Sequence, residues 1–335
     1  MPSEVLLECV PNFSEGRRPE VIHRIAEAIR AVPGQQLLHT DPSPSANRTV
    51  FTFAGSPEAV VEAAFKAIET AAGAIDMRLQ RGAHPRLGAT DVCPLIPLKG
   101  LSMDEAVHWS KVLAEKVGSL LQIPVYLYEH SSDKDFRRSL PSIRKGEYEG
   151  LLSKMALPGW QPDAGPGPGN AAGIARTGAT IIGARNILVA FNVSLNTDDE
   201  RIAADIARQI RSSNQGLLPA VRAIGWYMQD FGCAQVSMNL LNYELTSPLK
   251  AWETCRMLAA ARGVEAVGCE VIGLIPEQCV LEAGYKAAYN KGYAGELGAD
   301  AYIQLGIAYM GLDKVKPFDP SEKILEFALR RAGLL

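Results

Sequence analysis

The chain has 335 residues, of which 47% are hydrophobic and 21% are charged, and 34 Lys and Arg stand against 37 Asp and Glu. This composition is typical of a globular protein with enough apolar residues for two cores. The resulting net charge of −3 argues against nucleic acid or an anionic membrane as a partner. The six cysteines form no C-x-x-C pair, and no apolar run reaches the roughly 20 residues of a membrane helix. The N-terminus lacks the basic and apolar segments of a signal peptide, so we expect a cytoplasmic protein.

Apolar periodicity predicts the first half in the order β-α-β-β-α-β. Strands are predicted where short apolar runs are bounded by turn residues, and helices where apolar residues recur every three or four positions. The predicted ranges are a strand at 5–10, a helix at 18–31, strands at 35–39 and 49–54, a helix at 57–74 and a strand at 92–96. A helix at 103–121 and a strand at 125–128 follow.

The second half repeats this order. Its predicted elements are a strand at 186–193, a helix at 198–210, strands at 221–228 and 234–240, a helix at 248–261 and a strand at 266–275. The series β-α-β-β-α-β is typical of a ferredoxin-like unit, in which both helices cover one face of an antiparallel sheet. We therefore predict an α+β protein of two duplicated ferredoxin-like subdomains, at 1–178 and 179–335, with a ligand groove between them.

A segment rich in Gly and Pro, 158–170, lies between the two predicted halves. Its composition allows a flexible linker. However, it contains Trp160 and lacks the Ser and Lys of disordered spacers. Glycines there would let the backbone approach a flat ligand closely, so a binding loop is the alternative.

His84 is the best candidate for acid–base chemistry among the five histidines. It lies in the sequence RGAHPRLG, where neighbouring arginines would lower its pKa and keep it neutral and basic near pH 7. His23 and His108 fall in predicted helices, His130 in a polar stretch, and His39 at a strand end beside Asp41. There is no H-E-x-x-H, G-x-S-x-G or Walker A motif, so we expect metal-free general acid–base catalysis.

Polar residues also crowd the ends of two predicted strands, at 11–16 and 45–49. Side chains such as Asn12, Ser14, Asn47 and Arg48 could converge at one end of the sheet. The alternative is that Asn12 and Ser14 form turns and cap a helix.

The ordered string of segments resembles the formiminotransferase family. The first three read ECVPNFSEG, NRTVFTF and GAHPRLGATDVCP, at 8–16, 47–53 and 82–94. Further matching segments lie at 124–128, 146–149, 183–185, 190–192, 225–227 and 235–237. The resemblance runs from about residue 5 to the C-terminal helix without a large gap.

The resemblance implies a duplicated ferredoxin-like fold and transfer of a formimino group from N-formimino-glutamate to tetrahydrofolate. It implies that His84 is the catalytic base, that Asp41 stabilises the cationic amidine, and that folate binds along 165–178. Arg48, Arg86 and Arg185 are candidates for the substrate carboxylates, although each could form a structural ion pair. The full set of expected binding residues is Asn12, Ser14, Glu15, Asn47, Arg48, Arg86, Trp160, Asp163, Gly165, Pro166, Gly178, Arg185 and Asn192.

The resemblance also implies a homodimer with small-molecule substrates. Animal-type members carry a second, all-helical cyclodeaminase domain beyond this region, so a separate cyclodeaminase is expected to act on the product. The segment at 166–172 departs from the animal-type pattern. Two alternatives remain open. One is another folate enzyme on the same scaffold, using a different donor or cyclising 5-formyltetrahydrofolate with ATP; the other is a folate-binding protein without activity.

Overall fold

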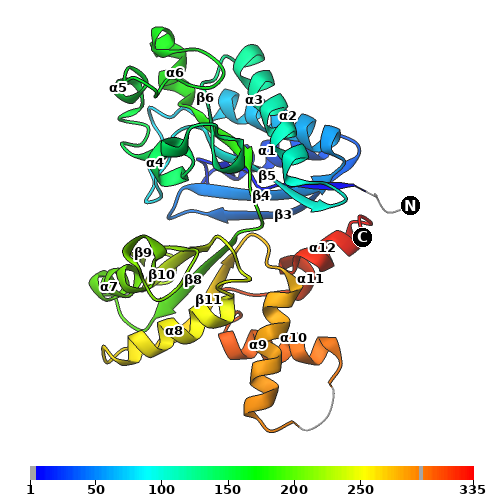
Figure 1. The fold of residues 1–335 in the computed structure, drawn as a ribbon, viewed down its shortest axis with the longest axis vertical. Coiled ribbons are helices and arrows are strands. Elements are labelled where there is room, and N and C mark those ends of the chain that lie inside the picture. Colours follow the sequence, from blue (N-terminus) through cyan, green and yellow to red (C-terminus); the bar gives the residue numbers. More distant parts are fainter. Residues whose placement is uncertain (1–4, 294–296) are drawn as a thin grey trace. The chain divides into compact units, whose positions relative to one another are not determined.

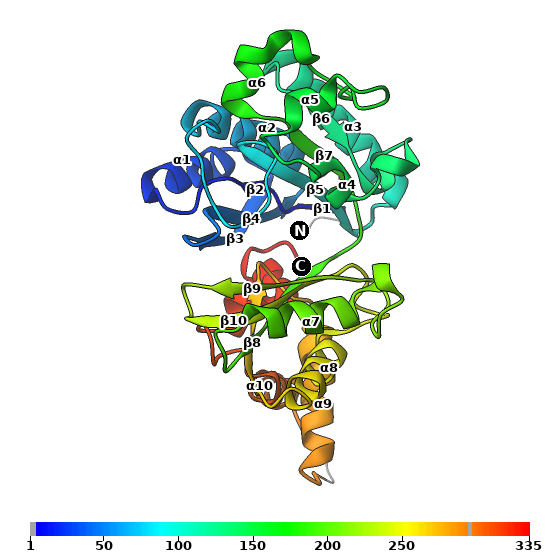
Figure 2. The ribbon, with the colours of Figure 1, turned by 90° about the vertical axis from the view of Figure 1, so that its left-hand side faces the viewer.

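The computed structural model describes residues 5–293 and 297–335, and the chain divides into two compact units (Figures 1 and 2). Unit 1 runs to Arg185 and includes the C-terminal stretch Ala332–Leu335, and unit 2 is Asn186–Arg331. The division falls after Arg185 rather than after residue 178. The reason is strand β7 (Thr180–Ala184), which pairs with strands of unit 1 and was not predicted from the sequence.

Unit 1 contains one mixed sheet with the strand order β3-β4-β1/β2-β5-β7-β6. Its other strands are β1 (Leu6–Cys9), β2 (Asn12–Phe13), β3 (Gln35–Ser43), β4 (Arg48–Gly55), β5 (Thr90–Lys99) and β6 (Val125–Leu127). Because β1 and β2 both pair with β4 and β5, they act as one interrupted strand. Strands β3, β4, β1/β2 and β5 pair with one another in antiparallel fashion, whereas β7 runs parallel to β5 and β6.

Three long helices cover one face of this sheet (Figure 1). They are α1 (Pro19–Arg30), α2 (Pro57–Ala74) and α3 (Met103–Leu120). Local sequence sets where they begin: Ser56 caps α2, and Ser102 and Glu105 form a capping box on α3. Their apolar sides pack on alternate residues of the strands, such as Phe51 and Phe53 of β4, and form the core of the unit.

The opposite face of the sheet is divided in two. Over β5, β7 and β6 lies a second apolar cluster made with the short helices α4 (Leu140–Arg144), α5 (Leu151–Met155) and α6 (Ala171–Thr177). Over β2, β3 and β4 the side chains are mostly polar, because residues that alternate with the core positions include Asn12, Asp41, Arg48 and Thr52. This polar face carries several of the residues expected at the site. Short 3₁₀ helices lie at Glu129–Ser131, Asp135–Arg137 and Pro168–Asn170.

Unit 2 contains a four-stranded antiparallel sheet with the order β11-β8-β10-β9. Its elements are β8 (Val189–Leu195), α7 (Glu200–Ile210), a 3₁₀ helix (Ser212–Asn214), β9 (Val221–Met228), β10 (Cys233–Leu240), α8 (Pro248–Ala260) and β11 (Ala266–Ile272). Helices α9 (Glu277–Asn290), α10 (Ala299–Met310), α11 (Pro320–Lys323) and α12 (Leu325–Arg331) complete it. The predicted elements from 186 to 275 agree with the observed ones to within three residues at most ends.

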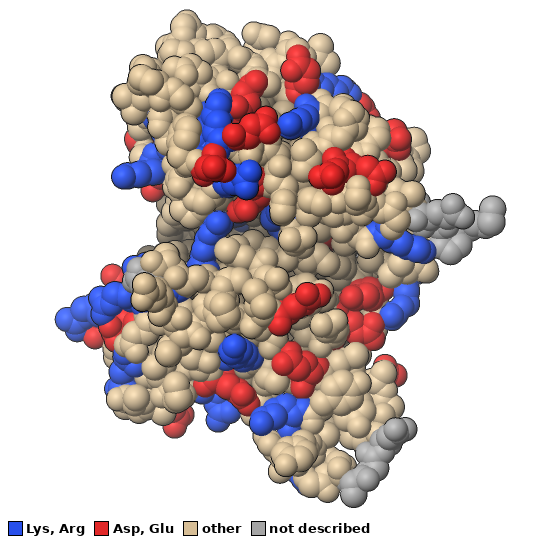
Figure 3. Space-filling model, viewed as in Figure 1, with Lys and Arg blue, Asp and Glu red and all other residues tan. Residues whose placement is uncertain are grey.

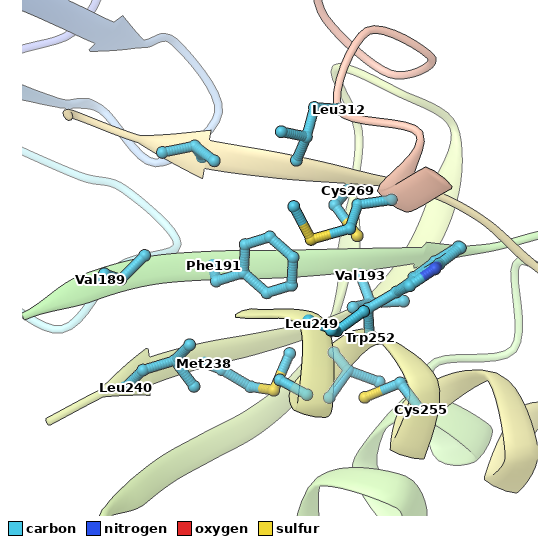
Figure 4. Close-up of a cluster of buried hydrophobic side chains, with 14 of the residues drawn as sticks. Val189, Phe191, Val193, Met238, Leu240, Leu249, Trp252, Cys255, Cys269 and Leu312 are labelled. Carbon is cyan, nitrogen blue, oxygen red and sulfur yellow. The ribbon is translucent and has the colours of Figure 1, made fainter. Parts of the chain in front are cut away.

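The core of unit 2 lies between its sheet and its helices. Figure 4 shows Phe191 and Val193 of β8 facing Leu249, Trp252 and Cys255 of α8. Every residue of this buried cluster lies between Val189 and Ile324, so the core belongs to unit 2 alone. On the other face of the sheet, alternate positions of β8 and β10 include the polar residues Asn192, Ser194, Gln235, Ser237 and Asn239.

The Gly- and Pro-rich segment at 158–170 lies within unit 1 and is not a connection between the units. The ring of Trp160 packs against Phe136, with the centroids 5.3 Å apart, and lies under Lys154 Nζ. Asp163 accepts a hydrogen bond from the backbone N–H of Leu127 and pairs with Lys134 and the fully buried Arg137. Of the two alternatives left open by the sequence, a flexible linker does not describe the first half of this segment, because ion pairs and aromatic contacts hold it in place.

Acidic and basic side chains are mixed on the face shown in Figure 3. No helix among the described residues is long and apolar enough to cross a membrane. The same part of the chain contains no group of three His, Cys, Asp or Glu side chains placed to hold a metal ion.

Candidate active site

Asn12, Arg48 and His84 meet on the polar face of unit 1. Asn12 lies on β2 and Arg48 begins the neighbouring β4, whereas His84 lies in the loop before β5. Nε of Arg48 donates to Oδ1 of Asn12 at 2.9 Å, and Nη2 donates to the same oxygen. Nη1 of Arg48 contacts both ring nitrogens of His84, with Nδ1 at 2.7 Å. The structure thus brings together three residues that the sequence placed far apart.

The hydrogen bonds of His84 assign its tautomer. Its Nδ1 lies 2.6 Å from the carbonyl oxygen of Pro85, which can only accept, so Nδ1 carries the proton. Its Nε2 then carries the lone pair, and it faces Arg48, which can only donate. The Pro85 carbonyl therefore selects the neutral form of the ring with Nε2 as its proton acceptor, whereas Arg48, which contacts both nitrogens, requires only that one of them accept.

The half-buried His84 has a pKa well below the ordinary imidazole value. Burial is the largest cause, followed by the positive charges of Arg48 and Arg144, while the hydrogen bond to Pro85 acts weakly against them. The predicted direction is confirmed, but its sources are not the loop arginines Arg81 and Arg86. Burial and the guanidinium of Arg144 also lower the pKa of Arg48 to about 9.

Arg144 and Asp91 belong to this cluster, and sequence reasoning did not single them out. Asp91 is 2% exposed at its side chain and accepts from Nε of Arg144 at 3.2 Å and from Nη2 of the same residue. Its Oδ1 also accepts from the backbone N–H of Leu87 at 2.9 Å, which fixes the end of the His84 loop. An acidic residue at the start of an apolar strand, beside Val92, was the available signal.

Arg86 fixes the loop that carries His84 through hydrogen bonds to three side chains. Its Nη1 and Nη2 donate to both carboxylate oxygens of Glu149 at 2.8 and 2.6 Å, and Nη1 also donates to Glu147 at 3.0 Å. Its Nε donates to Oε1 of Gln80 at 2.9 Å. This arrangement is the structural ion pair left open by the sequence, and it ties the loop to residues 147–149.

Ser14, Glu15 and Asn47 support the cluster through the backbone. Ser14 Oγ donates to the carbonyl of Gly88 at 2.7 Å, and Glu15 accepts from the backbone N–H groups of Arg17 and Arg18 before α1. Asn47 accepts from the N–H of Gly16 and donates to the carbonyl of Arg81. Helix α1 begins at Pro19 without a side-chain cap, so neither Asn12 nor Ser14 caps it.

Asp41 lies on β3, opposite Val50 of β4 and on the same face as Arg48. Its Oδ2 is 3.6 Å from Nε2 of His39, which is too long for a hydrogen bond. The register of the sheet therefore places Asp41 across β4 from Asn12, which also lies opposite Val50.

The end of the Gly-rich stretch contacts the His84 loop directly. Ala89 N–H donates to the carbonyl of Thr177 at 2.7 Å, and Ala179 N–H donates to that of Leu87 at 3.2 Å. Gly178, with φ +69°, lies so close that a Cβ there would be 2.2 Å from the carbonyl oxygen of Leu87. Gly165 also has a positive φ and packs against Gly118 of α3, while Pro166 is half-buried.

The remaining expected residues have other partners. Trp160 and Asp163 anchor the segment before Gly165, as described above, and Arg185 ends unit 1 beside Tyr128, whose pKa burial raises to about 12. Asn192 lies on β8 of unit 2, where its amide donates to Glu270 at 3.1 Å. His23, His108 and His130 are exposed.

Two family sequence patterns match nearly the whole chain. The N-terminal subdomain of the formiminotransferase domain matches residues 6–185, and the formiminotransferase domain matches residues 190–330. The chain belongs to the formiminotransferase family. In this formiminotransferase chain, the matched regions coincide with the two structural units.

Relatives fall into two groups by length. Formimidoyltransferase-cyclodeaminase of Rattus norvegicus is 44% identical over 98% of this chain, which spans 60% of that relative. Glutamate formimidoyltransferases of Streptococcus pyogenes serotype M1 and Thermoplasma acidophilum are each 41% identical to this chain over 83% of its length. The match covers 91% and 90% of these two relatives, respectively. Among solved structures, pitrilysin matches with a TM-score of 0.18 at 10% identity over 99% of this chain and 41% of its own, which carries no argument.

Proposed function

We propose that this chain is a glutamate formimidoyltransferase, which moves a formimino group from N-formimino-L-glutamate to tetrahydrofolate. The two shorter relatives carry this name and match over most of their length. The observation that carries the proposal is the tautomer of His84, because a neutral imidazole with its Nε2 lone pair on a polar face is a general base. The reaction belongs to folate-dependent histidine degradation.

In the proposed reaction, His84 accepts one proton from tetrahydrofolate and later donates it to the leaving amine. N5 of tetrahydrofolate attacks the amidine carbon, and Nε2 of His84 accepts the N5 proton as the new C–N bond forms. The tetrahedral intermediate then collapses, the bond to the glutamate nitrogen breaks, and the imidazolium returns its proton to the leaving amine. The products are 5-formimino-tetrahydrofolate and glutamate. Holding both substrates together supplies much of the rate, so the steps require no further reactant.

We assign Asp41 to the cationic amidine and the stretch 165–178 to folate. The buried carboxylate of Asp41 lies on the same sheet face as Arg48, which supports the first role. Residues 167–172 are exposed and rich in Gly and Pro, and the stretch ends on the His84 loop, which supports the second. Arg185 and Asn192 are kept as proposed substrate contacts on the strength of the family resemblance.

We also propose that the two units are duplicated ferredoxin-like subdomains. Taking the β1/β2 pair as one strand, the first four strands of unit 1 and the four strands of unit 2 have the same order, 4-1-3-2 in chain order. In both units the helices between these strands pack on one face. We also propose that the protein forms a homodimer and that a separate cyclodeaminase acts on its product. A cytoplasmic location stays a prediction from the sequence.

The test is an assay of the purified protein with tetrahydrofolate and formimino-glutamate, without ATP or metal. Equal amounts of 5-formimino-tetrahydrofolate, followed by absorbance, and of free glutamate would support the transferase. A requirement for ATP would indicate a cyclo-ligase type of enzyme. Folate binding without glutamate release would indicate another donor or a binding protein.

His84→Asn is the variant that tests the base. We expect turnover to fall roughly 10²–10⁴-fold, the usual effect of removing a general base, with little change in folate affinity. His108→Asn is the matched control, because that histidine is exposed on α3. Unchanged turnover in His84→Asn would remove His84 from this role.

A further inference from the structure

The proton-accepting atom of His84 is occupied in this structure. Nε2 carries the lone pair, and Nη1 of Arg48 contacts it. An arginine has donors and no acceptor, so this contact uses the lone pair that the proposed reaction requires. The base can act only after the guanidinium group of Arg48 has moved away from it.

Arg48 and Arg144 are each held by one neighbour through Nε and Nη2. Asn12 holds Nε and Nη2 of Arg48, which leaves Nη1 as the group on His84. Asp91 holds Nε and Nη2 of Arg144, which leaves Nη1 of Arg144 for another acceptor. Asp91, which holds Arg144, also accepts from the backbone N–H of Leu87, three residues from His84. Both guanidinium groups lower the pKa of His84, and Arg144 lowers that of Arg48.

The charges of this cluster do not cancel. Two guanidinium groups stand against the single carboxylate of Asp91, since Asn12 and the assigned tautomer of His84 are neutral. The carboxylates of Glu147 and Glu149 are engaged by Arg86. An excess positive charge beside the Nη1 donors of the two arginines suits a carboxylate, which can accept from two donors at once.

We propose that Arg48 and Arg144 together form the receptor for a carboxylate of the amino-acid donor, and that this carboxylate draws Nη1 of Arg48 away from Nε2 of His84. The inference rests on the proposed function, because it takes the donor to be an amino-acid amidine. Nε and Nη2 of Arg48 keep their bond to Asn12 while Nη1 changes partner. Donor binding therefore releases the base, and an amidine without a carboxylate leaves it blocked.

A purely positioning role for Arg48 predicts a different response. In that case the guanidinium group would stay on His84 whether or not a carboxylate is bound. A measurement on His84 itself separates the two roles, and it does not depend on turnover.

The experiment follows His84 by nuclear magnetic resonance in protein labelled with ¹⁵N-histidine. The five histidines of the chain give few signals, and His84→Asn identifies the one of interest. Glutarate serves as the probe because it has the two carboxylates of the donor and no reacting group. Glutaramide, its neutral diamide, is the matched control ligand.

We expect glutarate to change the Nε2 shift of His84 and to raise its pKa toward the ordinary imidazole value, because the carboxylate removes Arg48 and balances its charge. Glutaramide should leave both unchanged. Arg48→Gln should abolish the response, and Arg144→Gln should weaken glutarate binding about ten- to hundredfold, the effect of one charge-assisted hydrogen bond. Arg30→Gln is the control variant, because Arg30 pairs only with the exposed Glu27 on α1.

Two results would overturn the proposal: no response of His84 to glutarate in the wild-type chain, or an equal response in Arg48→Gln. If Arg48→Gln fails to fold, as judged by circular dichroism, the comparison of glutarate with glutaramide and the Arg144→Gln variant decides. A response of His84 in a chain that transfers no formimino group would keep the carboxylate receptor and reject the proposed function instead.

Discussion

At the scale of single residues, the chemistry of the site depends on how two side chains are held. The Pro85 carbonyl fixes one tautomer of His84, and burial together with Arg48 and Arg144 keeps it neutral. Asp91 in turn holds Arg144 and the loop backbone at Leu87. Asn12, Arg48 and His84 thus form one hydrogen-bonded group, and Asp91, Arg144 and Leu87 form another at the end of the same loop.

The low pKa of His84 predicts an unusual pH dependence. kcat/KM reports the free enzyme, in which His84 stays unprotonated well below pH 6.5. We therefore expect kcat/KM to stay level as the pH falls through 6.5 and to drop only at the lower pKa of the folded protein. The acid limb of kcat should lie at higher pH, since bound carboxylate raises the pKa. A fall in kcat/KM with a midpoint at pH 6.5 would contradict the role of His84 as a base with a lowered pKa.

The same shift affects stability, with a definite sign. Below about pH 6.5 an unfolded chain protonates His84 while the folded chain does not, so the folded state loses stability as the pH falls through this range. Above pH 6.5 both states hold the neutral ring and the contribution is constant. His84→Asn should therefore flatten the dependence of unfolding free energy on pH below 6.5.

Asp91→Asn should destabilise the protein by about 3–5 kcal/mol, because it leaves the buried guanidinium of Arg144 without its partner. Urea unfolding measures the loss. Glu27→Gln is the control, since the Glu27–Arg30 pair is more than half exposed at both side chains and should cost less than about 1 kcal/mol. Equal losses in the two variants would show that burial does not decide the effect.

At the scale of elements, the His84 loop is held by segments that lie far from it in sequence. Arg86 ties it to residues 147–149, Asp91 ties it to α4 through Arg144, and the backbone around Gly178 pairs with residues 87–89. The loop is thus fixed at its C-terminal end by three separate contacts. A base that must meet two substrates benefits from such support.

Gly178→Ala should be costly because the position combines two constraints. Its φ of +69° and ψ of −151° are nearly restricted to glycine, and a Cβ would lie 2.2 Å from the Leu87 oxygen. We expect a loss of about 3 kcal/mol or more in urea unfolding, together with reduced turnover. Gly146→Ala is the control: φ there is +88°, but the nearest atom is 3.7 Å from the added Cβ, so a loss of about 1–2 kcal/mol is expected. Similar losses would remove the close approach as the cause.

At the scale of the whole molecule, the two units have independent hydrophobic cores. The large cluster of unit 2 draws only on residues between Val189 and Ile324, while both clusters of unit 1 draw on residues between Leu7 and Ala184. Each sheet also closes within its own unit, since no strand pairs across the boundary among the described residues. Cores and sheets of this kind are the usual basis of separate folding.

We therefore expect residues 186–331, expressed alone, to fold and to unfold cooperatively. Circular dichroism and thermal unfolding of this fragment measure the outcome, and the fragment 1–185 is its counterpart. Mutating Phe191 to Ala, which removes a fully buried ring from this core, should abolish the transition or lower its midpoint by several degrees. A fragment without cooperative unfolding would show that the units depend on one another.

The sequence by itself determined the repeated order of elements, the family and the central role expected of the segment around His84. These follow from local signals: apolar periods, capping residues such as Ser56 and Ser102, and ordered motifs. It could not determine that Arg48 contacts His84, that Arg144 pairs with Asp91, that Arg86 pairs with Glu149, or that β7 belongs to unit 1. Those facts depend on contacts between residues about 35 to 90 positions apart, which only the tertiary structure brings within hydrogen-bonding distance.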